Sequence, residues 1–123
     1  MVEPMGFRLT EKNLKRAGCD YWDDVEVVRW PCVEAYSAAH GDDEQHLFAG
    51  QGACGYRDAV YGPDAFLLFG RESRGLDQAI IDARADRCRR IPMREGARSL
   101  NLSNAVAIAA YEALAQQGFP GLV

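Results

Sequence analysis

The sequence predicts an α/β fold built on a parallel sheet. Short apolar runs that favour strands alternate along the chain with segments that carry helix start and stop signals. One of these runs, Ala65–Phe69 (AFLLF), is continuously apolar, as expected for a strand buried on both faces. Strands that alternate with helices are typical of parallel sheets, whose ligands bind beyond the carboxyl ends of the strands.

Three elements are predicted in the first third of the chain. A threonine before a helical run and a glycine after it are helix start and stop signals, and proline is favoured in the first turn of a helix. Valines close to a tryptophan favour a strand. The expected elements are a helix at Leu14–Ala17 between Thr10 and Gly18, a strand at Val25–Trp30, and a helix between Pro31 and Gly41.

The rest of the chain predicts strands and helices in alternation. Short apolar runs predict strands at His46–Ala49, Ala65–Phe69 and Arg89–Met93. An aspartate before a helical pattern, and a glycine with a proline after one, mark helix ends. These signals place one helix at 78–84 after Asp77, and the last helix from about Asn101 to Gln117, before Gly118 and Pro120.

Composition bounds the class of protein. The chain has 123 residues, so residues 1–123 are expected to form a single domain. No apolar run approaches the roughly 20 residues that a membrane-spanning helix needs, and the first residues lack the features of a signal peptide. The four cysteines include no C-x-x-C pair, which gives a metal site little support and predicts reduced thiols in a cytoplasmic protein.

Charge is distributed unevenly. The net charge of −4 argues against a general nucleic-acid binder, because such proteins usually present a basic surface. Acidic residues gather at 20–26 and 42–44, whereas arginines gather later, at Arg71, Arg74, Arg84, Arg87, Arg89, Arg90, Arg94 and Arg98. These arginines are explained either as a solvated surface or as partners of an anionic ligand.

Three loops follow predicted strands and carry glycine or polar residues. They are GQGACG after Ala49, GRESRG after Phe69 and REGARS after Met93. The carboxyl ends of parallel strands meet at one edge of the sheet, so these loops are expected to converge on a ligand site.

The loop GQGACG also matches the dinucleotide-binding pattern G-x-G-x-x-G. That fingerprint requires a helix to open at its third glycine, and here Gly62 and Pro63 follow too soon for a full helix. A glycine-rich turn, or a loop whose backbone lies close to some ligand, explains the pattern better.

Two longer segments resemble the second and third signature motifs of one enzyme superfamily. They are FGRESRGL at 69–76 and IPMREGARSLNLSNAVAIAAYEAL at 91–114. Both resemble the SPOUT RNA methyltransferases, which are trefoil-knotted, and among these the small tRNA ribose 2′-O-methyltransferases of the wobble position. The segments EPMGFRL, LKRAGCDYW and QGFPG resemble the same subgroup, so the resemblance covers nearly the whole chain.

The resemblance implies a C-terminal trefoil knot that holds S-adenosylmethionine in a bent conformation. By motif position, the cofactor contacts would be Gly50, Gly70, Ile91, Met93, Ser99 and Leu100. The polar active-site positions would be Glu72, Ser99 and Asn101. Simpler interpretations stay open, because Asn101 and Ser103 are ordinary helix-capping residues and Glu72 is compatible with an idle surface position.

The implied reaction is 2′-O-methylation of ribose in tRNA. An enzyme for this reaction must position the 2′-hydroxyl and remove its proton. Arg71, Arg74 and Arg98 lie in the motif loops and are candidates for phosphate contact. The resemblance also implies a homodimer that uses the alanine-rich last helix near Tyr111, although an ordinary core helix explains the same residues.

The family's first motif has no counterpart in this sequence. That motif comprises an opening strand, a loop with asparagine and a helix with an arginine, whereas MVEPMGF resembles the end of the family's second strand. We therefore expect an N-terminally truncated domain that lacks on the order of 30 residues. A second hypothesis follows, namely a non-catalytic dimeric module that binds the cofactor, or an inactive fragment.

Overall fold

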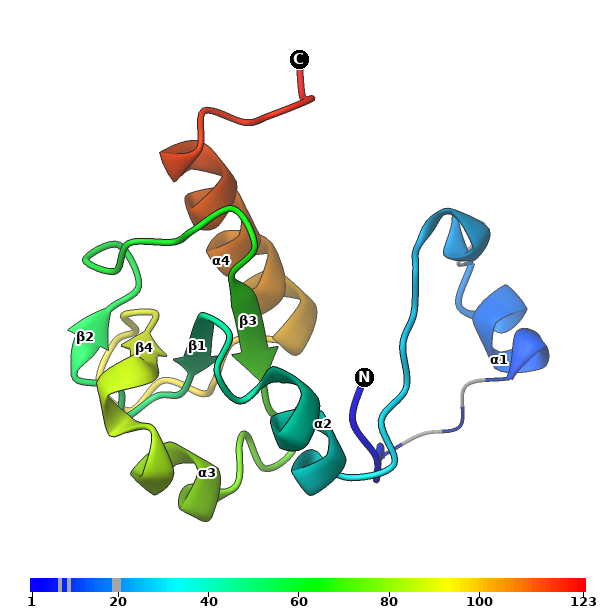
Figure 1. Ribbon diagram of the computed structural model, residues 1–123, viewed down its shortest axis with the longest axis horizontal. Helices are drawn as coiled ribbons and strands as arrows, with labels where there is room; N and C mark the ends of the chain where they lie inside the picture. Colours follow the sequence, from blue (N-terminus) through cyan, green and yellow to red (C-terminus); the bar gives the residue numbers. More distant parts are fainter. Residues whose placement is uncertain (7, 9, 19–20) are drawn as a thin grey trace. The chain divides into compact units, whose positions relative to one another are not determined.

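Four parallel strands form the centre of residues 43–123 (Figure 1). The sheet order is β2-β4-β1-β3, and Leu47 in β1 lies opposite Leu68 and Cys88. This arrangement confirms the predicted parallel α/β class. The elements of this unit are β1 (Gln45–Phe48), β2 (Cys54–Gly55), β3 (Phe66–Phe69), α3 (Gln78–Ala83), the 3-10 turn η2 (Ala85–Arg87), β4 (Cys88–Arg90) and α4 (Leu102–Gln116).

The sheet separates two apolar clusters. Successive side chains of a strand point to opposite faces, so Leu47 and Phe48 belong to different clusters. Leu47 packs with Ile81 of α3, and Phe48 packs with Ala109 of α4. The helix α4 lies beside β3 (Figure 1). The helices therefore cover the two faces of the sheet, while its carboxyl edge is left to the loops.

The last helix begins and ends close to the predicted residues. Asn101 is its N-cap, and Gly118 adopts the left-handed conformation just after it, with φ +74°. Ala109 is fully buried, and its small side chain lets the helix approach the sheet closely. Tyr111 is 63% exposed, so the interpretation of this tyrosine as a core residue is wrong.

One expectation about this unit is wrong, namely that the run Ala65–Phe69 is buried on both faces. All four residues of β1 are buried, whereas β3 is half-buried throughout, because β3 lies at an edge of the sheet that the described residues form. The helix predicted after Asp77 is present and has Asp77 at its N-cap position, although the Asp77 side chain makes no capping hydrogen bond.

The computed structural model describes residues 1–6, 8, 10–18 and 21–123, and Met1–Asp42 form a compact unit of their own. This unit holds α1 (Glu11–Arg16), the 3-10 turn η1 (Trp22–Asp24) and α2 (Val33–His40). Thr10 caps α1 as predicted, since its hydroxyl accepts a hydrogen bond from the Asn13 amide.

The predicted strand at Val25–Trp30 is wrong. Within the described part of the unit, its ladder pairing is a lone bridge between Trp30 and Val2, closed by backbone bonds of 2.8 and 2.9 Å. A strand is stabilised by a partner along its length, and β-propensity alone does not supply one. Parts of EPMGFRL and LKRAGCDYW lie outside the described residues, as does Cys19.

The described cysteines are free thiols, namely Cys32, Cys54 and Cys88. Over the described ranges, each helix is too short or too polar to span a membrane.

Candidate active site

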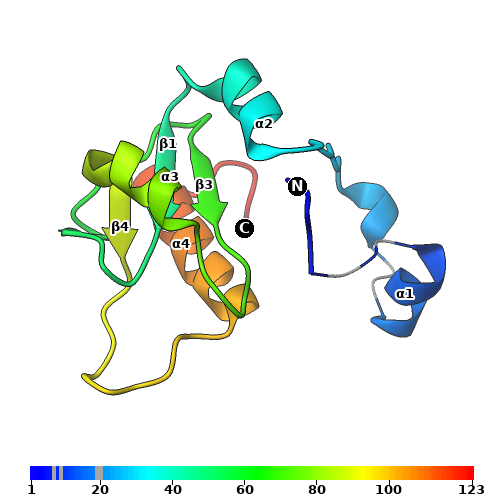
Figure 2. The same cartoon turned by 90° about the horizontal axis from the view of Figure 1, so that it is seen from below.

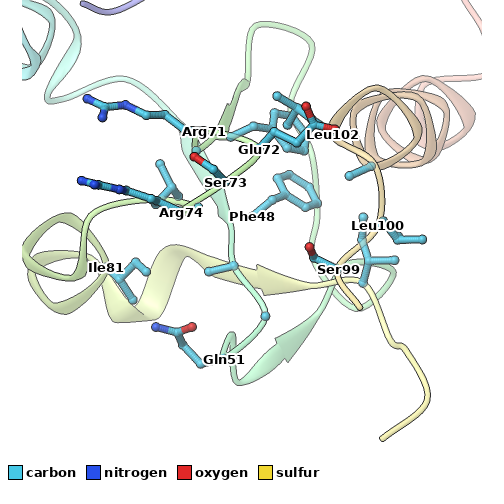
Figure 3. Close-up of a pocket in the computed structure, with 18 of the residues that line it drawn as sticks. Phe48, Gln51, Arg71, Glu72, Ser73, Arg74, Ile81, Ser99, Leu100 and Leu102 are labelled. Atoms are coloured by element: carbon cyan, nitrogen blue, oxygen red, sulfur yellow. The ribbon is translucent and has the colours of Figure 1, made fainter. Parts of the chain in front are cut away.

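Three loops and the start of α4 enclose a pocket of about 490 Å³ at the carboxyl edge of the sheet (Figure 3). The loops follow β1, β3 and β4, and the third of them is the long connection to α4 visible in Figure 2. The predicted convergence of the loops is therefore confirmed. Arg94–Arg98, the middle of the third loop, is not part of the lining.

The loop after β3 is a tight turn that presents its tip to the pocket. Arg71 and Gly75 exchange two backbone hydrogen bonds, of 3.1 and 2.7 Å. Gly75 has φ +70°, which favours glycine. A Cβ on Gly70 would lie 1.8 Å from the Gly75 carbonyl carbon, so the loop folds back on a position where a side chain has no room. Glu72 and Ser73 are held at the tip.

Glu72 lines the pocket, and it contacts Asn101, which lies beside the pocket but is not part of its lining, although the two residues are distant in the sequence. The Asn101 amide nitrogen donates a hydrogen bond of 3.1 Å to Oε1 of Glu72. Asn101 is also the N-cap of α4, because its Oδ1 accepts from the backbone N–H of Ser103 at 2.9 Å. Capping and contact with Glu72 are thus not alternatives, since the two ends of one amide group serve them separately.

All six positions that the resemblance implies for the cofactor line the pocket. Gly50, Gly70 and Ile91 come from the three strand ends, and Met93, Ser99 and Leu100 come from the loop before α4. Met93 and Leu100 are 43% and 36% exposed, which leaves apolar surface at the mouth of the pocket.

The three predicted RNA-binding arginines separate into two groups. Arg71 and Arg74 line the pocket and are exposed, and Figure 3 shows their side chains extending to the same side of the loop. Arg98 is exposed in the loop before α4, but it does not line the pocket.

Sequence reasoning missed a polar chain on the pocket wall. The Gln51 amide donates to Oε1 of Gln78 at 2.9 Å, and the Gln78 amide donates to Asp82 at 2.7 Å. Both glutamines line the pocket. From the sequence, Gln51 could have been identified as a site residue because it lies in one of the three converging loops. No feature of the sequence pointed to Gln78.

GQGACG begins with a tight turn, as the glycine-rich interpretation predicts, in which the Gly52 amide donates to the Ala49 carbonyl at 3.1 Å. The short strand β2 follows at Cys54–Gly55, where the fingerprint requires a helix. Gly52 is buried, and a Cβ there would lie 2.7 Å from the carbonyl carbon of Arg89. The glycine is needed for close packing of the turn on β4.

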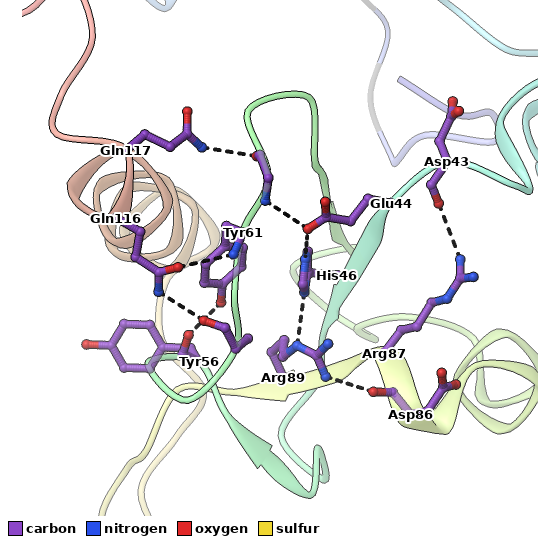
Figure 4. A network of polar contacts seen from close by, with 12 residues as sticks. Asp43, Glu44, His46, Tyr56, Tyr61, Asp86, Arg87, Arg89, Gln116 and Gln117 are labelled. Atoms are coloured by element: carbon purple, nitrogen blue, oxygen red, sulfur yellow. Dashed lines mark hydrogen bonds and ion pairs between the residues drawn. The ribbon is translucent and has the colours of Figure 1, made fainter.

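A second polar cluster, which we call the His46 network, comprises Glu44, His46 and Arg89 (Figure 4). Arg89 donates to Nδ1 of the buried His46 at 3.0 Å, so Nε2 carries the imidazole proton and donates to Glu44 at 2.7 Å. Glu44 also accepts from the Gly62 amide at 3.0 Å. The His46 ring packs on Tyr61, with centroids 4.5 Å apart.

Hydrogen bonding and burial shift three pKa values in this unit. The Gly62 amide and His46 hold the pKa of Glu44 below its ordinary value. Burial raises the pKa of Tyr61 to about 12 and also raises the pKa of the Cys88 thiol. Tyr61 and Cys88 therefore remain neutral at physiological pH.

In the described parts of the chain, no three histidine, cysteine or acidic side chains form a cluster that could hold a metal ion. The candidate site consists of backbone, apolar side chains and a few polar groups.

The fold and the pocket define an α/β domain with a small-molecule site at the carboxyl edge of a parallel sheet. The model of the SpoU rRNA methylase family matches residues 1–111, and the chain belongs to this family. The tRNA (cytidine(34)-2′-O)-methyltransferase of Escherichia coli (strain K12) is 42% identical over 126 aligned positions, which cover 100% of this chain and 79% of that protein. The protein of the same name from Burkholderia pseudomallei (strain 1106a) is 40% identical and covers 98% of this chain and 80% of its own length.

Solved structures agree with this assignment. A structure described as giving insights into the 2-OH methylation of C/U34 on tRNA superposes with a TM-score of 0.85 at 36% identity, over 95% of this chain and 72% of that one. An AdoMet-bound rRNA methyltransferase from Sinorhizobium meliloti superposes with a TM-score of 0.71 at 26% identity, over 81% of this chain and 39% of that one. The resemblance found in the two motifs is confirmed.

Proposed function

We propose that this chain catalyses S-adenosylmethionine-dependent 2′-O-methylation of ribose at position 34 of tRNA. Membership of the family and the names of relatives about 40% identical support the proposal. The observation that carries it is the hydrogen bond between Asn101 and Glu72, which joins two motif segments at the pocket.

The pocket has the size and lining that the cofactor requires. Small-molecule sites occupy roughly 300–1,000 Å³, and this pocket measures about 490 Å³. At Gly50 a Cβ would meet no protein atom within 4 Å, so this glycine preserves open space beside the pocket. The residues that would hold the cofactor are Gly50, Gly70, Ile91, Met93, Ser99 and Leu100, and it would supply a methyl group activated by a positively charged sulfur.

The side chains of the chain must orient the ribose hydroxyl. Glu72 exposes a carboxylate at the pocket, and Ser99 exposes a hydroxyl from the opposite loop. A carboxylate and a serine hydroxyl are both able to hydrogen-bond to a ribose hydroxyl. Asn101 donates a hydrogen bond that holds the Glu72 carboxylate in place. Positioning of this kind contributes a large part of the rate in reactions between two bound groups.

The two arginines beside Glu72 suit an RNA substrate. Arg71 and Arg74 extend from the same loop and are exposed, as phosphate-binding side chains need to be. We assign Arg98 to a more distant phosphate, because it stands outside the pocket.

We also infer a cytoplasmic homodimer that forms one methyltransferase domain per chain and contains the family's knot. The exposed Val106 and Tyr111 on α4 are apolar surface that a second copy would cover. The family match over residues 1–111 crosses both compact units, which supports one domain rather than two.

The test is a methylation assay on the protein expressed with any residues that its gene encodes before Met1, here called the full natural protein. It is incubated with a tRNA transcript and methyl-labelled cofactor, and the digested RNA is examined for 2′-O-methylated nucleosides. We expect label on nucleotide 34. A transcript with a 2′-deoxy residue at position 34 is the matched control and should accept no label.

Two results would contradict the proposal. Label that persists on the 2′-deoxy transcript would show another target. Binding of S-adenosylhomocysteine without any methyl transfer to tRNA would favour the non-catalytic module. Calorimetry with S-adenosylhomocysteine on the 123-residue chain separates that module from a fragment without a working pocket.

A further inference from the structure

The orientation of the Asn101 side chain depends on Ser103. Oδ1 of Asn101 accepts two hydrogen bonds from this one residue, from its backbone N–H at 2.9 Å and from its hydroxyl at 2.5 Å. The amide nitrogen of Asn101 faces Glu72 instead. An amide oxygen only accepts and an amide nitrogen only donates, so this orientation pairs every group with a proper partner.

The Ser103 hydroxyl is not needed to cap α4. An N-cap serves a helix by accepting from a free backbone N–H, and the Ser103 N–H already fulfils that role for Asn101. A serine hydroxyl inside a helix often bonds to a carbonyl one turn back. Here it donates a second hydrogen bond to the side-chain oxygen of the cap residue, in addition to the one from the backbone N–H.

The consequence of a turned amide falls on Glu72. With the amide reversed, Oδ1 of Asn101 would face the Glu72 carboxylate, and two acceptors would repel each other. Glu72 is exposed at the tip of its loop, and among the described residues its side chain accepts a hydrogen bond from Asn101. The hydrogen bond to Glu72 therefore requires the nitrogen end of the Asn101 amide to face the carboxylate.

We propose that Ser103 is a positioning residue for methyl transfer, which acts by fixing the Asn101 amide so that it donates to Glu72. The inference rests on the proposed function, in which Glu72 orients the ribose hydroxyl. Ser103 itself is exposed and is not part of the pocket lining, so it is not expected to touch cofactor or ribose.

The kinetic test compares four variants of the full natural protein at saturating cofactor and tRNA. Ser103→Ala removes the hydroxyl and keeps the capping N–H. It should lower kcat by on the order of 10- to 100-fold, the cost of a misplaced group, with little change in KM for tRNA. Ser103→Thr restores a hydroxyl and should recover most of the activity. Asn104→Ala, at the next exposed position of the helix, is the matched control and should retain wild-type kcat.

The fourth variant combines Ser103→Ala with Asn101→Ala. If the hydroxyl acts through the amide, its loss should cost nothing further once the amide is gone. The proposal is overturned by an undiminished effect of Ser103→Ala in that background, by failure of threonine to rescue, or by an equal loss in Asn104→Ala.

A spectroscopic measurement on the 123-residue chain separates this inference from the proposed function. The ¹³C resonance of the Glu72 carboxyl carbon reports its hydrogen bonding without any substrate. Ser103→Ala should shift this resonance in the same direction as Asn101→Ala, and Ser103→Thr should not. If the wild-type protein transfers no methyl group to tRNA, the proposed function fails, and the resonance alone decides whether Ser103 orients Asn101. An unchanged resonance in Ser103→Ala overturns the inference.

Discussion

Residues 43–123 contain two polar clusters that differ in how many of their hydrogen-bonding groups are satisfied within the protein. In the His46 network, the imidazole is 4% exposed and both of its nitrogens are bonded within the protein. At the pocket, Glu72 and Asn101 are exposed and share one hydrogen bond. Within the described residues, one amide hydrogen of Asn101 and one carboxylate oxygen of Glu72 form no hydrogen bond.

The difference separates stability from chemistry. A buried polar group must be bonded or it costs free energy, so a closed cluster such as the His46 network fixes the packing around it. A cluster with unused donors and acceptors beside a pocket can bind a ligand. Arg89 of the His46 network also lines the pocket. We therefore expect substitutions of Glu44 and His46 to change the free energy of unfolding, and substitutions of Glu72 and Asn101 to change the rate of methyl transfer.

The largest effect is expected at the loop that carries Glu72. Gly70→Ala places a Cβ 1.8 Å from the Gly75 backbone, so the loop must open and the pocket should lose measurable affinity for S-adenosylhomocysteine. The comparison variant is Gly118→Ala, after α4, where φ is +74° and no atom lies within 4 Å. It should cost about 1–2 kcal/mol of stability and leave that affinity unchanged. Calorimetry and thermal melting measure both quantities, and retained affinity in Gly70→Ala would contradict the loop geometry.

The next largest effect is expected for the hydrogen bond between Asn101 and Glu72. Asn101→Ala should cost about 1 kcal/mol of stability, as a lost cap does, and should lower methyl transfer by on the order of 10²-fold, the loss typical of one positioned donor. Glu72→Ala should lower transfer with a smaller change in stability. The double variant should lose less than the product of the two single losses, because the residues act as one unit. Multiplicative losses would show that the two loops do not form one site.

The His46 network should respond in the opposite way. His46→Ala removes the partner of both Glu44 and Arg89 and should lower the free energy of unfolding by about 1–3 kcal/mol. His46→Phe keeps a ring against Tyr61 and loses only the nitrogens, so the two variants separate packing from hydrogen bonding. Chemical denaturation measures both. The kcat of the folded full natural protein should stay near the wild-type value, and a fall like that of Glu72→Ala would erase the distinction between the clusters.

The smallest effect is a pH dependence of stability from Glu44. Its pKa is lowered from 4.5 by the Gly62 amide and His46, so its charged form contributes stability above about pH 4.5 and loses it as the pH falls through the lower, folded pKa. The side chain is 44% exposed, so the contribution is about 0.2–1 kcal/mol. The stability difference between wild type and Glu44→Gln should be constant at neutral pH and disappear in acid. A difference that grows in acid would contradict the sign.

Local sequence signals predicted the helices whose ends are marked by capping and stop residues. Helix α4 was placed to within one residue at each end, because Asn101, an alanine-rich stretch and Gly118 all mark it. Among the described residues, the segment Val25–Trp30 has no strand partner beyond the bridge to Val2, because pairing is not encoded in the propensity of a single segment. For the same reason, the run Ala65–Phe69 could not reveal that β3 lies at an edge.

Sequence motifs predicted only those residues of the candidate site that lie within the motifs. Glu72 and Asn101 are 29 positions apart, and only the family resemblance connected them before the structure brought them within 3.1 Å. The Gln51–Gln78 bond and the His46 network were missed, because side-chain partners from different elements have no local signature. Arg98 was grouped with Arg71 and Arg74 on sequence position, and the long loop before α4 holds it away from the pocket lining.

The hydrogen bonds of Asn101 to Glu72 and to the Ser103 backbone N–H restrict how this protein can vary during evolution. Aspartate, serine and threonine start a helix about as well as asparagine does. Aspartate cannot donate a hydrogen bond to Glu72 and would add a second negative charge beside it. Serine and threonine are too short to accept from the Ser103 backbone N–H and reach Glu72 at the same time. Drift at position 101 should therefore be much narrower than at Thr10, the cap of α1, which a helix start alone constrains.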